Sequence, residues 1–251
     1  MITLQELCLY LEALLQTQSF SDYCVNGMQV EGRSEVKKIA CAVSASLSTI
    51  EAAAEAGVDV LIVHHGMFWN RDSYVVQGTK RKKLQLLLEN GISLLAYHLP
   101  LDAHQEYGNN WTAARQLGWE NLEPFGLCEG KLIGVKGTLP KQQRQQFQES
   151  LESYYGHPAH AAPGGSEWIS SAALISGGAY KSITEAAATG VDCFVTGNFD
   201  EPAWHQAYEE QINFFALGHS NTEEVGPRAL AQHLEEQFKI PTAFLQIENP
   251  F

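Results

Sequence analysis

The sequence predicts an α/β protein made of two similar halves, each a βαβαβ unit. Apolar runs typical of buried strands alternate with helical patterns, which is the order of a parallel sheet covered by helices. The pattern of the first half then recurs in the second half in the same order. The chain has 251 residues, of which 45% are hydrophobic, so it is long and apolar enough to bury a substantial core.

The first half opens with a helix and continues with strands. Thr3 and Glu6 form a capping-box pattern ahead of leucines at helical spacing, which predicts a helix over about 3–16. Ser48 and Glu51 have the spacing of a helix start, which predicts that Ser48 caps the second helix. Three apolar runs predict strands of the parallel sheet, at 38–43, 58–63 and 92–97.

Two stretches of the first half are echoed in the second. Residues 51–59 read EAAAEAGVD and residues 185–192 read EAAATGVD, each followed by an apolar strand pattern. After that strand, residues 92–98 read ISLLAYH and residues 212–219 read INFFALGH. Two matches in the same order predict an internal duplication.

The segment between the halves has a different character. A short strand pattern covers 132–138, Pro140 opens a glutamine-rich helical pattern, and 158–165 is rich in proline, alanine and glycine. The chain is therefore divided into a first half at 1–123, an intervening segment with a small β-α element at 124–168, and a second half at 169–251.

Composition and charge exclude several classes of partner. The net charge is −13, with 16 lysines and arginines against 29 acidic residues, which disfavours binding to nucleic acid. The basic run 80–83 at a predicted helix start is interpreted as a solvated face. The sequence has no apolar run of the length that a membrane span needs, no secretory pattern, and five cysteines without a C-x-x-C pair. We therefore expect a cytoplasmic protein with reduced thiols.

Histidines and acidic residues follow the predicted strands. His64 and His65 end the strand at 58–63, and adjacent residues of an extended chain point to opposite sides, so the pair suits two ions better than one. Asp102 lies four residues after His98, and Glu223 lies four residues after His219, again beyond predicted strand ends. The pattern predicts a binuclear metal site, although a buried ionic cluster that holds the halves together is the alternative.

The type of side chain narrows the chemistry. Imidazole and carboxylate ligands suit zinc, iron or manganese, whereas calcium prefers oxygen ligands alone. Two such ions can lower the pKa of a shared water, as in binuclear hydrolases. His98 is predicted either to support the metal ligands or face the substrate, or to be a core histidine that bonds to the backbone, and no other catalytic residue is identified.

The motifs resemble those of the NIF-three-like family, whose bacterial members are often called GTP cyclohydrolase 1 type 2 homologues, and most closely its YbgI type. The resemblance covers nearly the whole chain and is carried by residues 26–32 (NGMQVEG), 64–69 (HHGMFW), 98–104 (HLPLDAH), 218–223 (GHSNTE) and 247–250 (IENP). It implies two α/β domains facing a cleft that contains two metal ions, and a toroidal homohexamer.

The resemblance also implies roles for individual residues. The metal ligands would be His64, His65, Asp102, His219 and Glu223. Glu223 would bridge the ions, His65 and Asp102 would complete one shell, and His64 and His219 the other. Relatives commonly have glutamate after a Thr-Gly pair, whereas this chain has Asn198 after Gly197, which removes an acid or base from that position.

Two functions follow as hypotheses. The first is a metal-dependent hydrolase acting on a small molecule, which the resemblance suggests is a nucleotide or a phosphoester. The second is a non-enzymatic protein that handles metals or acts as an assembly scaffold, because a shared fold and metal site do not determine the reaction.

Overall fold

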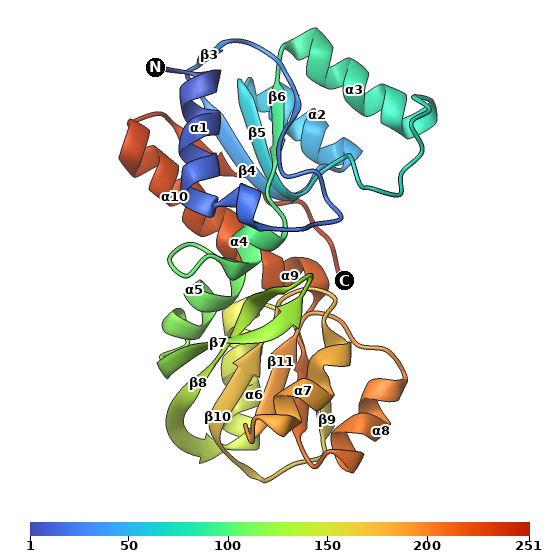
Figure 1. The fold of residues 1–251 in the computed structure, drawn as a ribbon, viewed down its shortest axis with the longest axis vertical. Helices are drawn as coiled ribbons and strands as arrows, with labels where there is room; N and C mark the ends of the chain where they lie inside the picture. The colour runs from blue at the N-terminus through green and yellow to red at the C-terminus, as the bar shows by residue number, and fades with distance from the viewer. The chain divides into compact units, whose positions relative to one another are not determined.

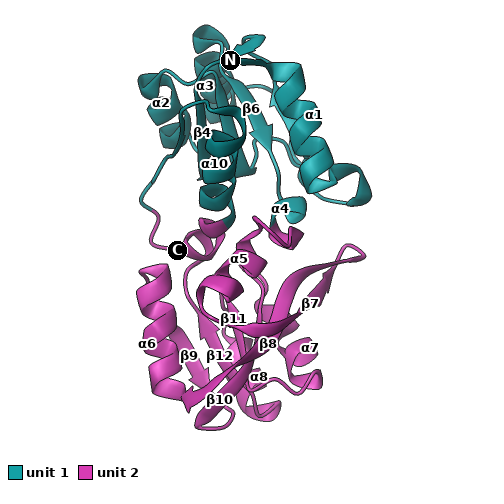
Figure 2. Cartoon of the chain, turned by 90° about the vertical axis from the view of Figure 1, so that its left-hand side faces the viewer, with its two compact units in different colours: residues 1–101, 226–248 teal, residues 102–225, 249–251 magenta.

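The computed structural model describes residues 1–251, and the chain divides into two compact units (Figure 2). Unit 1 comprises residues 1–101 and 226–248, and unit 2 comprises residues 102–225 and 249–251. The unit boundaries thus differ from the divisions at 123 and 168 drawn from the sequence. The reason for the discontinuous unit 1 is that the last strand, β13 (Thr242–Phe244), pairs with β4 (Ile39–Ser44) near the start of the chain.

Unit 1 is built on a five-stranded sheet with the order β13-β4-β5-β6-β2. Strand β5 (Val60–His65) lies between β4 and β6 (Ser93–Ala96), and all three are parallel. Strand β2 (Gly27–Val30) is antiparallel to β6 at one edge of the sheet. The three parallel strands confirm the three predicted apolar runs, within two residues at each end.

Helices cover both faces of this sheet, which explains why its strands are apolar throughout. Alternate residues of β5 enter two cores: Val60 and Ile62 pack with α1 (Leu4–Leu15) and α10 (Val225–Phe238), while Leu61 and Val63 pack with α2 (Leu47–Ala56) and α3 (Gly78–Asn90). Figure 1 shows α1 and α10 on one side of β4 and β5, and α2 and α3 on the other. A two-stranded sheet of β1 (Ile2–Thr3) and β3 (Glu35–Val36) and the 3-10 turn η1 (Thr17–Ser19) complete the unit.

Unit 2 contains a six-stranded sheet with the order β7-β8-β10-β11-β12-β9. Its central strands β10, β11 and β12 are parallel, and β7, β8 and β9 are antiparallel to their neighbours. The strands are β7 (Glu120–Cys128), β8 (Lys131–Gln143), β9 (His160–Pro163), β10 (Trp168–Leu174), β11 (Cys193–Thr196) and β12 (Asn213–Ala216).

Helices and 3-10 turns link and cover these strands. The helices are α4 (Leu99–Ala103), which crosses the unit boundary, α5 (Asn109–Gln116), α6 (Arg144–Tyr155), α7 (Ile183–Ala188), α8 (Pro202–Glu209) and α9 (His219–Glu223), with the turn η2 (Tyr180–Ser182). Each unit therefore contains one β-α-β-α-β segment, β4 to β6 in unit 1 and β10 to β12 in unit 2. None of the helices combines the length and apolar character that crossing a bilayer requires.

Helix α1 confirms the predicted capping box, because Thr3 accepts a hydrogen bond from the Glu6 N–H while the Glu6 side chain accepts from the Thr3 N–H. The cap predicted at Ser48 is wrong. Ser46 is the cap, and its Oγ accepts from the Thr49 N–H at 3.0 Å.

One prediction for the intervening segment is also wrong. Pro140 does not open a helix but lies in β8, where residues 139–141 face a single residue of β10 in a β-bulge, a position that needs no ladder hydrogen bond from proline. Helix α6 begins four residues later, at Arg144. The stretch 158–165 contains the edge strand β9, which pairs with β12.

Candidate metal centre

His64 and His65 lie at the carboxyl end of β5, in the centre of the unit 1 sheet. His64 is 0% exposed, and its Nδ1 lies 3.1 Å from the backbone oxygen of Tyr97. A carbonyl only accepts, so Nδ1 carries the proton and Nε2 carries the lone pair, which is the form that binds a metal. His65 is half-buried, with Nδ1 3.1 Å from the Oγ of Ser44. Both rings are thus oriented by neighbouring strands, as metal-binding imidazoles are.

His98 joins this pair in unit 1. It follows β6, and its ring centroid lies 5.0 Å from that of His64 and 5.6 Å from that of His65. One nitrogen of each of the three rings lies within 4.8 Å of the others, close enough to hold one ion. The structure therefore places His98 beside the predicted ligands rather than in a separate core.

Asp22 fixes the orientation of His98. Its Oδ1 lies 2.9 Å from the His98 Nδ1, and its carboxylate also accepts hydrogen bonds from the backbone N–H of Leu99 and Cys24 and from Asn26 Nδ2. Burial alone would raise the pKa of Asp22, but the hydrogen bond and charge of His98, together with the Cys24 and Asn26 bonds, lower it. Sequence spacing gave no indication of this pair, because the two residues are 76 positions apart.

His219 and Glu223 form the corresponding pair in unit 2. They lie one turn apart on α9, which follows β12, and the His219 Nε2 is 3.2 Å from the Glu223 Oε2. Glu223 is 3% exposed. The Oγ1 of Thr222, on the same helix, accepts from the Gly177 N–H at 3.0 Å and so ties α9 to the turn after β10.

Gly177 leaves the space that the Glu223 carboxylate occupies. A Cβ at position 177 would lie 2.1 Å from Glu223 Oε1 and 3.2 Å from His219 Nε2. The residue also has φ of +66°, a left-handed conformation that glycine adopts without strain. No other residue type would leave both the backbone turn and the carboxylate in place.

Asp102 is the third predicted ligand in unit 2. Its buried Oδ1 accepts hydrogen bonds from Asn109 Nδ2 at 2.9 Å and from Ser176 Oγ at 3.0 Å. A carboxylate oxygen of Asp102 lies within 4.8 Å of one of Glu223. Two buried carboxylates this close repel each other, and a divalent cation would relieve the repulsion. This donor set therefore fits a metal ion.

The five predicted ligands thus gather in two sets, His64 and His65 in unit 1, and Asp102, His219 and Glu223 in unit 2. Their arrangement around two shared ions stays a prediction.

Asn198 is half-buried and follows β11. Its backbone N–H donates to the oxygen of Gly177 at 2.9 Å, which places its backbone beside the turn that contacts Glu223. Asp22, Asn109 and Ser176 were not identified as site residues from the sequence.

The chain matches known proteins over nearly its whole length. Residues 2–250 match the model of the family described as Duf34/NIF3 (NGG1p interacting factor 3). A GTP cyclohydrolase 1 type 2 homolog of Chlamydia muridarum (strain MoPn / Nigg) is 54% identical over 96% of each chain. A protein of the same name from Deinococcus radiodurans is 39% identical over 96% of this chain and 91% of its own.

Solved structures show the same fold. The structure described as protein ybgI, of unknown function, has a TM-score of 0.93, 36% sequence identity and 100% coverage of both chains. TTHA1606 from Thermus thermophilus has a TM-score of 0.93 and 35% identity, again with 100% coverage of both chains. The α/β fold predicted from the sequence, and the resemblance to this family, are confirmed.

Proposed function

Because the chain belongs to the Duf34/NIF3 family, we propose that it binds two divalent metal ions and catalyses a metal-dependent hydrolysis. The observation that carries the proposal is the buried pair of carboxylates, Asp102 and Glu223, whose oxygens lie within 4.8 Å of each other. A cation would compensate buried like charges at this distance, and the nearby His219 is a ligand type that zinc, iron and manganese prefer.

Five residues would hold the ions. They are the imidazoles of His64, His65 and His219 and the carboxylates of Asp102 and Glu223. Imidazole and carboxylate ligands in this ratio suit zinc, iron or manganese. When bound, two such cations activate water as a nucleophile and stabilise negative charge that develops on the substrate.

The remaining side chains would orient groups and move protons. Asn109 and Ser176 hold Asp102 Oδ1 in one position, which orients its other oxygen. Asp22 holds the Nδ1 proton of His98, so the His98 Nε2 is the atom that would accept a proton or donate one to a leaving group. His98 is thus the proposed acid or base. Asn198 cannot take this role, because its side chain has no ionisable group.

The proposed substrate is a small molecule, either a nucleotide or a phosphoester. This proposal is supported by the name of the similar proteins, GTP cyclohydrolase 1 type 2 homolog, which describes relatives and not an activity measured on this chain.

We also propose that the chain self-associates into a homohexamer. Light scattering would test this by measuring the molar mass, which is expected to be six times that of the monomer.

Metal content per chain tests the proposal. Plasma mass spectrometry on protein purified without chelator is expected to give about two ions per wild-type chain, as a binuclear centre requires. Glu223→Ala should lose most of this metal, whereas Glu209→Ala, which removes an exposed carboxylate of α8, should keep it. Metal that is absent from the wild type, and not restored by adding manganese, iron or zinc, would overturn the proposal.

Turnover separates an enzyme from a scaffold. The metal-loaded wild type is expected to hydrolyse GTP or a chromogenic phosphoester, and His98→Gln should slow turnover while keeping the metal. A chain that keeps its two ions without turning over any substrate, and that dissociates when the ions are chelated, would instead be a metal-dependent scaffold.

A further inference from the structure

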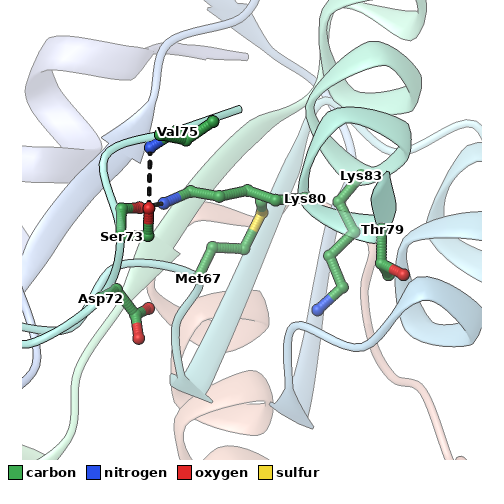
Figure 3. Close-up of a pocket in the computed structure, with 7 residues that line it drawn as sticks. All are labelled: Met67, Asp72, Ser73, Val75, Thr79, Lys80 and Lys83. Atoms are coloured by element: carbon green, nitrogen blue, oxygen red, sulfur yellow. Dashed lines mark hydrogen bonds between the residues drawn. The ribbon is translucent and has the colours of Figure 1, made fainter. Parts of the chain in front are cut away.

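A cavity of about 290 Å³ lies in unit 1, between the chain that follows β5 and the first turns of α3. Its walls carry two amino groups, from Lys80 and Lys83, one carboxylate, from Asp72, and the side chains of Met67 and Thr79 (Figure 3). The volume is just below the range for small-molecule pockets, which starts at about 300 Å³, so the cavity suits only a small ligand. None of these residues belongs to the predicted metal ligands.

Lys83 forms no ion pair with any carboxylate of the cavity. Its side chain is half-buried, and it forms no hydrogen bond or ion pair in the structure. Figure 3 shows its amino group directed away from the helix, on the side of the cavity opposite Asp72. Burial lowers the pKa of Lys83, because the charged form loses water without gaining a partner.

The sequence interpretation of 80–83 as one solvated face is therefore wrong for Lys83. Arg81 and Lys82 are exposed as expected. Lys83 lies one turn before Leu87, which is fully buried against the sheet, so the two share a face of α3. The helical period places this lysine on the inner side of the helix.

Lys80 supplies a second positive charge that no carboxylate neutralises. Its Nζ donates to the backbone oxygen of Ser73 at 2.7 Å and lies 4.9 Å from the centre of the Phe68 ring. These contacts connect the first turn of α3 to the chain after β5. With two ammonium groups and one carboxylate, the lining carries a net positive charge, and Asp72 forms no ion pair with either lysine.

We propose that this pocket binds a small organic anion, whose phosphate or carboxylate group pairs with Lys83 and lies within reach of Lys80. Charge-assisted hydrogen bonds from two ammonium groups to an oxyanion offset the cost of burying Lys83. The Thr79 hydroxyl can donate to the same oxyanion, and Asp72 would accept from a hydroxyl or amino group elsewhere on the ligand. The proposal does not depend on the metal ions.

Lysine acylation on the 251-residue chain tests the pocket directly. The protein is pulse-labelled with acetic anhydride in sodium chloride and in sodium phosphate of equal ionic strength, and each lysine is quantified by mass spectrometry. Phosphate is expected to slow acylation of Lys83 several-fold and to leave its neighbour Lys82 unchanged. Equal rates at Lys83 in both salts, or equal slowing of Lys82, would overturn the proposal. Repeating the labelling in sodium acetate distinguishes a carboxylate site, protected by both anions, from a phosphate-selective one.

Two matched variants give a second readout. Phosphate should raise the melting temperature of the wild type and of Lys82→Met, but not of Lys83→Met, which removes the ammonium and keeps the length of the side chain. The Glu223→Ala variant separates this site from the metal centre, because Lys83 must remain protected by phosphate when the metal is lost. A phosphate effect that survives in Lys83→Met, or that disappears in Glu223→Ala, would contradict the assignment.

Discussion

The Nδ1 atom of His98 lies 2.9 Å from the Oδ1 atom of Asp22, and this pair is buried in unit 1. Asp22 also accepts the backbone N–H groups of Leu99 and Cys24, so one carboxylate joins the segment before β2 to the segment after β6. The same side chain therefore orients an imidazole beside His64 and His65 and connects the loop around it.

Asp22→Ala is expected to destabilise the fold by on the order of 3 kcal/mol, because it leaves several buried donors without an acceptor. Asp22→Asn keeps an oxygen for part of this network and should lose less. Urea unfolding measures the difference, with Ser21→Ala as the control because Ser21 is the exposed neighbour. Equal stabilities of the wild type and Asp22→Ala would show that the network has no net effect.

Gly177→Ala is expected to reduce metal retention sharply. The new Cβ would lie 2.1 Å from Glu223 Oε1, and the φ of +66° adds about 1–2 kcal/mol of backbone strain. Gly178→Ala is the matched control, because its Cβ would meet only ordinary contacts, 3.6 Å from His219 Cε1. Metal content and melting temperature should fall for the first variant alone. If both variants keep the wild-type metal content, Gly177 does not position Glu223.

The sequence could predict the parts of the fold that depend on local pattern. The strands β4, β5 and β6 are buried on both faces, so their apolar runs mark them clearly. The edge strand β9 could not be recognised, because its pairing with β12 depends on residues about fifty positions away. Pro140 was misread because a bulge, which only the paired strand reveals, accommodates it.

The same limit applies to the site. His64, His65, Asp102, His219 and Glu223 could be selected because each follows a recognisable strand or its echo. Their supporting residues could not, because Asp22 contacts His98 across 76 positions and Ser176 contacts Asp102 across 74. The half-buried position of Lys83, in contrast, could have been predicted from the sequence. Lys83 lies four residues before Leu87, so a helical projection places it on the buried face of the helix.

Stability at alkaline pH should depend on the buried thiol of Cys41. Burial raises its pKa from 9.0 to about 12, so the folded state keeps the proton while the unfolded chain loses it above about pH 9. The contribution of this thiol to stability is therefore full below pH 9 and declines by up to about 1.4 kcal/mol per pH unit until about pH 12.

Cys41→Ala tests whether the contribution of this thiol to stability decreases above pH 9. The variant is expected to be less stable than the wild type at pH 7, because it loses buried contacts, and its deficit should narrow as the pH rises from 9 to 11. Unfolding free energies from urea titrations at each pH supply the comparison. Parallel stability curves for the two proteins would mean that Cys41 ionises equally in both states.

Ser176→Ala and Asn109→Ala are each expected to weaken metal binding by about tenfold, because partners that orient a ligating carboxylate typically contribute 10–100-fold to affinity. Both donors reach the same oxygen of Asp102, so the double variant should lose less than the product of the single losses once the carboxylate can rotate. Ser150→Ala, which removes only a hydroxyl bonded to its own helix α6, is the control. Competition with a chromophoric chelator measures each dissociation constant. If both single variants bind metal with wild-type affinity, either Asp102 is not a ligand or the metal alone holds it in place. The Asp102→Ala variant separates these two explanations. It would keep its metal only if Asp102 is not a ligand.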